Sequence, residues 1–569
     1  MTFTRIGWIR IILLFFLVVF ILRLGWLQLI QGDELRHDSE RNYYRWVSLP
    51  APRGIIYDRK GKPLAYNIQS KAVWLVSGQV PRSKDKKEWH ALISNLIRIG
   101  IFPDENSALD ELSEYIDHPN YQPIRLKNDL TIEEVTRLEE EMPYLPGIYV
   151  RLEPVRRYTG GSSAAHLLGY LREINAEELA TRRDKGYHLK DRIGKSGVEA
   201  EYEENLRGKD GRDEVVVDAL GRPLEEYKAI PPAEGATLTL TIDSNVQKAA
   251  EAGLKGKRGA AVAINPQTGE ILALVSSPSY DLNIMSKRVS PEYYRWMTKS
   301  GAQLNRATAG LYPPGSVFKI ITAATALENG KVNPSTSFYC DGQYYGIHCW
   351  KHEGHGLLNL NQAIAESCNV YFMHLAEKVQ GKNLTNMARK FGLGEDIDLK
   401  NIMPTSRGMI PTFENMTDKQ RRRWPLGNTL QMGIGQSVLT VTPLQSVRVV
   451  AAIANGGKLV TPYLVKRIGK IDEQTTKSTG IGLTPRTVQI IATGLKQVTS
   501  TGTGKSLDST LKIAGKTGTA QNRGEDHAWF AGYAPYDNPN IAVAVIIENG
   551  GHGGTIAAPI AQEMIRAYK

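Results

Sequence analysis

Three short polar motifs, far apart along the chain, constrain its fold more than any other feature of the sequence. The first pairs Ser316 with Lys319, and the second pairs Ser367 with Asn369. The third is Lys-Thr-Gly-Thr at residues 516–519, near the end of the chain. Each motif is too short to be informative alone. Their order is that of a serine acyltransferase, and the order and spacing of all three together make chance a poor explanation.

The first motif suits an activated serine. A serine hydroxyl is a poor nucleophile until a base takes its proton, and Lys319 lies one helical turn after Ser316, on the same face. Lys319 must be neutral part of the time to act as that base, and burial beside a charge such as Lys516 lowers its pKa. Pro-Pro-Gly at residues 313–315 predicts an abrupt loop-to-helix transition, where free N–H groups favour a developing anion. Taken alone, the pair also fits a capping serine and a solvated lysine.

The third motif lies in a predicted strand. Residues 511–520, 528–534 and 541–548 are typical of strands and predict a C-terminal antiparallel meander. A strand edge beside the nucleophile offers hydroxyls and a lysine charge to a substrate carboxylate, and Gly518 leaves room for an acyl chain. A solvated strand is the alternative. The second motif follows a predicted helix at residues 360–366, so plain helix capping is its alternative.

With these motifs the chain resembles the class B penicillin-binding proteins, which are membrane-anchored peptidoglycan D,D-transpeptidases, over nearly its whole length. Further segments that carry the resemblance are Pro-Arg-Gly-Ile-Ile-Tyr-Asp-Arg at 52–59, Gly-Val-Glu at 197–199, Leu-Arg-Gly at 206–208, Asn-Arg-Ala at 305–307, Gly-Ile-Gly-Gln at 433–436, Thr-Pro-Leu-Gln at 442–445 and Ala-Gln at 520–521. Together they resemble the penicillin-binding protein 2 branch, which serves cell-wall elongation and cell shape, more than the division branch. A division-branch transpeptidase is the alternative.

The resemblance implies a role for each motif residue. Ser316 would be the nucleophile and Lys319 its base. Ser367 and Lys516 would relay protons to and from the leaving group. Asn369 would hold the amide side chain of the donor peptide.

The resemblance also implies how the substrate is bound. The hydroxyls of Thr517 and Thr519, beside Gly518, would bind the terminal carboxylate of D-Ala-D-Ala or of a β-lactam. The backbone N–H groups of Ser316 and Thr519 would form the oxyanion hole. The donor peptide would acylate Ser316 with loss of D-Ala, and an amine of a neighbouring stem peptide would resolve the ester into a cross-link. This chemistry needs no metal.

Two other protein classes share such motifs. A serine β-lactamase hydrolyses its acyl-enzyme with a dedicated water-activating base, and it needs neither a membrane anchor nor two hundred residues before its catalytic domain. A penicillin-binding sensor or scaffold uses binding or acylation without turnover. The complete set of motif residues favours an enzyme with turnover.

The N-terminus carries a predicted membrane anchor. Residues 11–22 are an uninterrupted apolar run, which with its flanks reaches the roughly 20 residues needed to cross a bilayer. Arg5 and Arg10 precede the run, so the positive-inside rule predicts a cytoplasmic N-terminus. A cleaved signal peptide is the alternative, but no small-x-small cleavage site follows the run. We therefore expect a single-pass protein of the inner membrane with its bulk in the periplasm.

Length and composition predict more than one domain. The chain has 569 residues, of which 41% are hydrophobic and 23% charged, an ordinary globular balance. We predict a mixed α/β (α+β) protein with an anchor at residues 1–31, an elongated pedestal similar to a dimerisation domain at 32–235 and a transpeptidase domain at 236–569. The resemblance implies for the last an antiparallel sheet flanked by helices, with an all-helical lobe.

Charge and resemblance also bear on partners. The net charge of +11 is spread along the chain without a dominant basic block, so we predict no nucleic-acid partner. The resemblance implies peptidoglycan stem peptides as substrates and β-lactam antibiotics as inhibitors. It further implies a RodA-type membrane glycosyltransferase and other proteins of the elongation complex as partners.

The cysteines carry a second signal. All three, Cys340, Cys349 and Cys368, fall in one window that also holds His355. Three thiols and a histidine can bind zinc tetrahedrally, although this spacing is not a standard finger pattern. The alternative is a disulfide between Cys340 and Cys349 in an oxidising periplasm, with Cys368 as a buried thiol. The odd count weighs against a simple disulfide framework, and the resemblance extends to members that hold a metal here.

A zinc ion at this place would be structural. Cys368 lies between Ser367 and Asn369, so a metal bound to it would fix the loop that directs both side chains into the cleft.

Overall fold

The computed structural model describes residues 5–31, 44–76, 80, 86–113, 123–188, 190–217, 223–287, 289–411, 417, 424–473 and 476–568. The chain forms two compact units. Unit 1 consists of Met1–Arg53, Asn67–Val155 and Gly208–Gly235. Unit 2 consists of Gly54–Tyr66, Arg156–Arg207 and Ala236–Lys569. The predicted boundary after residue 31 falls at residues 32–43, which lie outside the described residues.

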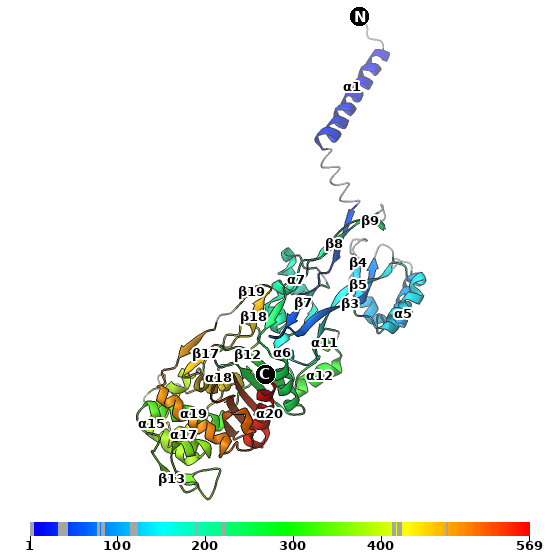
Figure 1. The fold of residues 1–569 in the computed structure, drawn as a ribbon. Coiled ribbons are helices and arrows are strands. Elements are labelled where there is room, and N and C mark those ends of the chain that lie inside the picture. The colour runs from blue at the N-terminus through cyan, green and yellow to red at the C-terminus, as the bar shows by residue number, and fades with distance from the viewer. Residues whose placement is uncertain are drawn as a thin grey trace. The chain divides into compact units, whose positions relative to one another are not determined.

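The predicted anchor is a helix. Helix α1 (Arg5–Gly25) continues into a π-helical turn, η1 (Trp26–Ile30) (Figure 1). No residue of the segment Ile11–Ile30 is buried inside the structure, and the segment is long and apolar enough to cross a membrane. A helix that is apolar all round and unburied has the composition that lipid requires.

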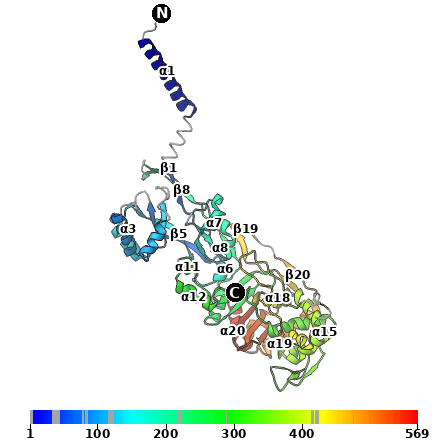
Figure 2. The ribbon, with the colours of Figure 1, turned by 180° about the vertical axis from the view of Figure 1, so that it is seen from behind.

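Unit 1 holds a small α/β core. The later residues of β3 (Pro63–Val76) pair antiparallel with β4 (Pro123–Lys127), and β5 (Ile148–Tyr158) also pairs with β3. The helices are α3 (Lys86–Ile99), α4 (Glu105–Ser113) and α5 (Ile132–Glu141). Their apolar faces, such as Leu92 and Leu96 of α3, pack against Val73 and Leu75 of β3, and α3 lies beside this sheet in Figure 2. A separate antiparallel sheet has the order β1 (Tyr44–Leu49), β8 (Gly211–Val217) and β9 (Pro223–Ile230).

Unit 2 is built on a five-stranded antiparallel sheet. Its order is β12 (Ile271–Ser277), β11 (Gly259–Ile264), β23 (Ile541–Ile547), β22 (His527–Ala534) and β21 (Ala514–Ala520). The predicted C-terminal meander is confirmed by the pairing of β21 with β22 and of β22 with β23. Strand β21 ends the order, so one of its edges has no partner strand among the described residues.

Both faces of this sheet are buried, which explains why its strands are continuously apolar. Helices α10 (Ser244–Leu254) and α20 (Gly553–Ala567) cover one face, where Ala261 and Val545 lie in their core (α20 is red in Figure 1). Helix α18 (Pro443–Ala454) covers the other face, where Val262 and Ile264 lie. Strand residues alternate between the two faces, so neither set can be polar.

Five of the other helices of unit 2 form a lobe beside the sheet. They are α13 (Lys319–Glu328), α14 (Leu360–Ala365), α15 (Asn369–Lys390), α17 (Leu426–Gly433) and α19 (Pro485–Ser500). The lobe also carries two short β-ribbons between α13 and α14. They pair β13 (Phe338–Cys340) with β16 (Gly356–Leu358), and β14 (Gln343–Tyr344) with β15 (Ile347–His348). The mixed α/β class is confirmed.

Candidate active site

The predicted nucleophile lies in a tight turn. A 3-10 turn, η5 (Gly315–Phe318), runs directly into α13 after Pro314, which confirms the predicted loop-to-helix transition. Gly315 has φ +52°, a left-handed conformation that glycine adopts without strain. A Cβ at Gly315 would lie 2.8 Å from the carbonyl oxygen of Thr519, so glycine also permits the close approach of the two segments. Ser316 is therefore carried directly against strand β21.

Lys319 joins the first motif to the second. Its side chain is fully buried, and Nζ donates to the carbonyl oxygen of Ser367 and to Oδ1 of Asn369, both at 2.7 Å. It also donates to Ser367 Oγ at 3.3 Å. Burial lowers the pKa of Lys319 to about 8, although the nearby thiols of Cys368 and Cys349 oppose that shift. The ammonium is thus close to losing its proton near neutral pH.

The second motif is a strained turn between two helices. Ser367 has φ 54°, a left-handed conformation that is uncommon for a residue with a side chain and is often found at functional sites. Helix α15 is capped by Cys368, whose Sγ accepts from the backbone N–H of Tyr371 at 3.4 Å. Because the cysteine does the capping, the side chain of Ser367 is left for Lys319.

Strand β21 brings the third motif to the same place. Lys516 is fully buried, and its Nζ donates to the carbonyl oxygen of Thr517 at 3.0 Å. Burial, and then the charge of Lys319, hold the pKa of Lys516 well below its ordinary value. Two lysines therefore compete for protons in one buried site. No hydrogen bond to Ser316 Oγ is found among the described residues, and such bonds often tighten only with substrate.

Gly518 has a packing role. A Cβ at this position would lie 2.9 Å from Cβ of Trp529 and 3.4 Å from a methyl of Val317. Glycine thus lets the strand lie flat between the neighbouring strand β22 and the turn that holds Ser316.

Thr503 contacts the third motif, although nothing in the sequence predicted it. Its Oγ1 lies 2.6 Å from Oγ1 of Thr517, and Thr519 lies on the same face of the strand as Thr517. The sequence places Thr503 between Gly502 and Gly504, which signals a tight turn but not what the turn contacts.

A partly buried charge network supports the segment before Ser316. Glu548 Oε1 accepts from the hydroxyl of Tyr312 and from Nε of Arg306, both at 2.7 Å. Its Oε2 accepts from Nε of Arg258 at 3.1 Å. Glu548 follows β23, so the network ties this segment to the sheet. Sequence reasoning identified the Asn-Arg-Ala segment only through resemblance and did not find its carboxylate partner.

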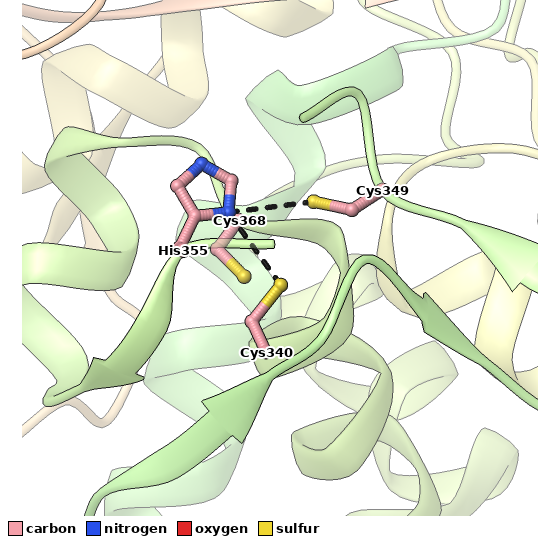
Figure 3. Close-up of side chains that lie close together, drawn as sticks. All are labelled: Cys340, Cys349, His355 and Cys368. Atoms are coloured by element: carbon pink, nitrogen blue, oxygen red, sulfur yellow. Dashed lines mark hydrogen bonds between the residues drawn. The ribbon is translucent and has the colours of Figure 1, made fainter. Parts of the chain in front are cut away.

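The four predicted metal ligands meet in one cluster. The three thiols and the ring of His355 point toward one another (Figure 3), and their ligand atoms all lie within 4.8 Å of each other. All three cysteines are free in this structure, and no bond joins Cys340 to Cys349 as the alternative disulfide would require. Nδ1 of His355 lies 3.5 Å from Cys340 Sγ and 3.6 Å from Cys349 Sγ. In a tetrahedral zinc site a thiolate and an imidazole nitrogen are about 3.5 Å apart.

This cluster directly adjoins the second motif, because Cys368 is the residue between Ser367 and Asn369. Cys368 belongs to the turn itself, and Cys349 Sγ accepts from the backbone N–H of Asn369 at 3.4 Å. Trp350 Nε1 also donates to the carbonyl oxygen of Glu366 at 3.0 Å. The segment just after β15, which carries Cys349 and Trp350, is thereby attached to both sides of the turn.

Comparison with known proteins adds an independent finding. The family described as "Penicillin binding protein transpeptidase domain" matches residues 259–566, and the "Penicillin-binding Protein dimerisation domain" matches residues 48–240. The chain is 32% identical to peptidoglycan D,D-transpeptidase MrdA of Haemophilus influenzae, over 95% of this chain and 88% of that protein.

Two solved structures are also similar. The complex of penicillin-binding protein 2 with MreC from Helicobacter pylori superposes with TM-score 0.76 at 28% identity, over 92% of this chain and 98% of that chain. A peptidoglycan synthase complex that coordinates polymerization and crosslinking has a chain with TM-score 0.73 at 30% identity, over 100% of this chain and 98% of that chain.

Proposed function

Because the chain belongs to the penicillin-binding protein family, we propose that Ser316 is the nucleophile of its transpeptidase domain. The protein is a peptidoglycan D,D-transpeptidase of the elongation branch, a serine-type acyltransferase that is also acylated by β-lactams. One observation carries the assignment of the site. Lys319 hydrogen-bonds both residues of the second motif, while strand β21 packs against the turn that holds Ser316.

The first half of the reaction forms the acyl-enzyme. Neutral Lys319 takes the proton of Ser316 as Oγ attacks the carbonyl carbon of the penultimate D-Ala. Backbone N–H groups of Ser316 and Thr519 stabilise the oxyanion. The C–N bond then breaks, and the amine of the terminal D-Ala leaves with a proton relayed through Ser367 and Lys516.

The substrate is held on both sides of the cleft. Asn369 binds the amide side chain of the donor, and the hydroxyls of Thr517 and Thr519 donate to its terminal carboxylate.

In the second half of the reaction, an amine of a neighbouring stem peptide attacks the ester carbonyl. Its proton passes back through the lysines, the C–O bond breaks, and Ser316 is regenerated as the cross-link forms.

Penicillin labelling tests this assignment. The detergent-solubilised full chain is incubated with benzylpenicillin, digested and mapped by mass spectrometry, and heat-denatured protein serves as the control. We expect one penicilloyl group on the peptide that contains Ser316, and release of D-Ala from a D-Ala-D-Ala donor when an acceptor amine is present. An adduct on another peptide would refute the assignment of Ser316. Release of the penicilloyl group within minutes would indicate a β-lactamase. Acylation without any peptide transfer would indicate a penicillin-binding sensor.

We also propose the placement and partners of the chain. The apolar helix α1 supports a single-pass anchor at residues 1–31 in the inner membrane, with the N-terminus in the cytoplasm. The pedestal at 32–235 and the transpeptidase domain at 236–569 would then lie in the periplasm. Because similar structures are complexes with MreC and of a peptidoglycan synthase, we propose a RodA-type glycosyltransferase and elongation proteins as partners.

We further propose that Cys340, Cys349, His355 and Cys368 hold one structural zinc ion. The donor set supports this, because three thiols and an imidazole nitrogen converge at distances suited to a tetrahedral site. Bound zinc would supply no reaction chemistry. It would hold the two β-ribbons to the turn between α14 and α15, from which the second motif projects.

Native mass spectrometry checks the metal. Wild-type protein is expected to carry one zinc ion that is lost on denaturation, and Cys340→Ala is expected to lose it under native conditions. The matched control is His352→Ala, because His352 lies in the same window but is exposed and outside the cluster. Loss of zinc should also lower the melting temperature and slow acylation, because the turn is no longer held. A metal-free wild-type protein that is acylated at full rate would contradict this proposal.

A further inference from the structure

One residue outside the three motifs contacts the segments of two of them. Thr503 lies in the loop after α19, and its Oγ1 is 2.6 Å from Oγ1 of Thr517 in the third motif. Its backbone N–H donates to the carbonyl oxygen of Ala365 at 3.2 Å. Ala365 ends α14, two residues before Ser367. Thr503 thus bridges the helical lobe and the sheet.

The loop that carries Thr503 is closely packed. A Cβ at Gly502 would lie 2.3 Å from the carbonyl oxygen of Ala365. A Cβ at Gly554, in the first turn of α20, would lie 2.7 Å from the carbonyl oxygen of Thr503. The N–H of Gly504 donates to the carbonyl oxygen of Val498 at 2.8 Å. Glycines on both sides let the backbone of Thr503 be clamped, so its hydroxyl is held in place before a substrate arrives.

The direction of the bond between the two threonines follows from counting protons. Each hydroxyl has one proton to donate and two lone pairs that accept. An ionised carboxylate can only accept, so Thr517 must give its own proton to a bound carboxylate. The proton in the 2.6 Å contact must then come from Thr503.

We propose that Thr503 is a positioning residue that donates to Thr517 Oγ1 and keeps the proton of Thr517 directed at the substrate carboxylate. This rests on the proposed function, in which Thr517 binds that carboxylate. Thr503 touches no substrate. The hydrogen bond from Thr503 excludes the orientations of the Thr517 hydroxyl in which its proton points away from the substrate. Acyl donors with a free terminal carboxylate are therefore favoured.

The test compares two acyl donors that differ only in the carboxylate. Second-order acylation rate constants are measured for the full-length protein with benzylpenicillin and with its methyl ester. Thr503→Val keeps the shape but not the hydroxyl, and is expected to slow acylation by benzylpenicillin about tenfold, the size of one hydrogen bond. The rate with the ester is expected to stay within about twofold. Thr503→Ser keeps a hydroxyl and is expected to recover most of the loss.

A double-mutant cycle separates this role from a structural one. Because Thr503 acts through Thr517, Thr503→Val should cause no further loss in a Thr517→Val background. Equal slowing with both acyl donors, or additive losses in the double mutant, would overturn the proposal. If Thr517→Val still prefers benzylpenicillin over its methyl ester, then Thr517 does not bind the carboxylate. In that case the proposed role of Thr503 fails as well. Melting temperatures check folding, and Thr503→Ala replaces the valine variant if that variant does not fold.

Discussion

Replacing Lys319 with methionine is expected to slow the acylation of Ser316 by benzylpenicillin about a thousandfold, within the range of a lost general base. Methionine keeps a long unbranched chain in the buried site, so the change removes the amine more than the packing. The hydrogen bonds from Nζ to Ser367 and Asn369 are lost as well. The measurement is stopped-flow or quenched acylation kinetics, with Ser316→Ala as the reference for complete loss.

The pH dependence of the acylation rate distinguishes a catalytic base at Lys319 from a side chain that only fills space. The pKa of Lys319 is lowered to about 8, chiefly by burial, and only the neutral amine can accept the proton of Ser316. Acylation by wild-type protein should therefore fall about tenfold for each pH unit below 8 and level off above it. Lys319→Met should lose this dependence, whereas Lys331→Met, at an exposed lysine just after α13, should keep it. A loss of less than tenfold with an unchanged pH profile would assign the base to another residue.

Which residue types meet at the candidate site could be predicted in part, because some of these contacts depend on residues that are close in the sequence. A serine and a lysine one helical turn apart face the same way wherever the helix lies. The conformations that aim these groups could not be predicted in the same way. The left-handed backbone of Ser367 and the capping of α15 by Cys368 depend on packing around the turn. No local preference favours either feature.

Contacts between distant segments were the main part that sequence reasoning missed. Tyr312 and Glu548 are hydrogen-bonded across 236 residues, and nothing near either residue indicates its partner. Thr503 shows the same limit, since its flanking glycines predict a turn but not a neighbouring strand. The meander was easier because β21, β22 and β23 are consecutive and their apolar runs are bounded by turn residues.

The cysteine cluster could be predicted in part. Cysteines confined to one window predicted a shared site, since ligand type alone limits what three thiols and an imidazole can do. The spacing did not fit a known finger because the ligands come from different elements. Cys340 ends strand β13, and Cys368 caps α15. Only the folded ribbons bring them together.

Replacing Arg156 with methionine is expected to lower the free energy of unfolding of unit 2 by about 3–5 kcal/mol, the cost of breaking a buried ion pair by removing one member. Arg156 Nε donates to Glu199 Oε1 at 2.8 Å, and the two side chains are only 3% and 0% exposed. The guanidinium also donates to the carbonyl oxygen of Gly54 at 2.9 Å, and the hydroxyl of Tyr158 reaches the same carboxylate oxygen at 3.3 Å. Methionine fills most of the space but satisfies none of these groups. Urea unfolding followed by tryptophan fluorescence measures the change.

An exposed ion pair in the same unit provides the matched control. Lys185 and Glu204 are 52% and 71% exposed, so Lys185→Met should cost less than about 1 kcal/mol. Removing both buried charges, in Arg156→Met with Glu199→Met, should recover a large part of the loss, because the buried carboxylate that Arg156 balances is removed with it. This recovery distinguishes a buried-charge penalty from simple loss of packing, which would grow with the second substitution. A single Arg156→Met variant as stable as the Lys185→Met control would show that water reaches Glu199 and that the pair does not hold this part of unit 2 together.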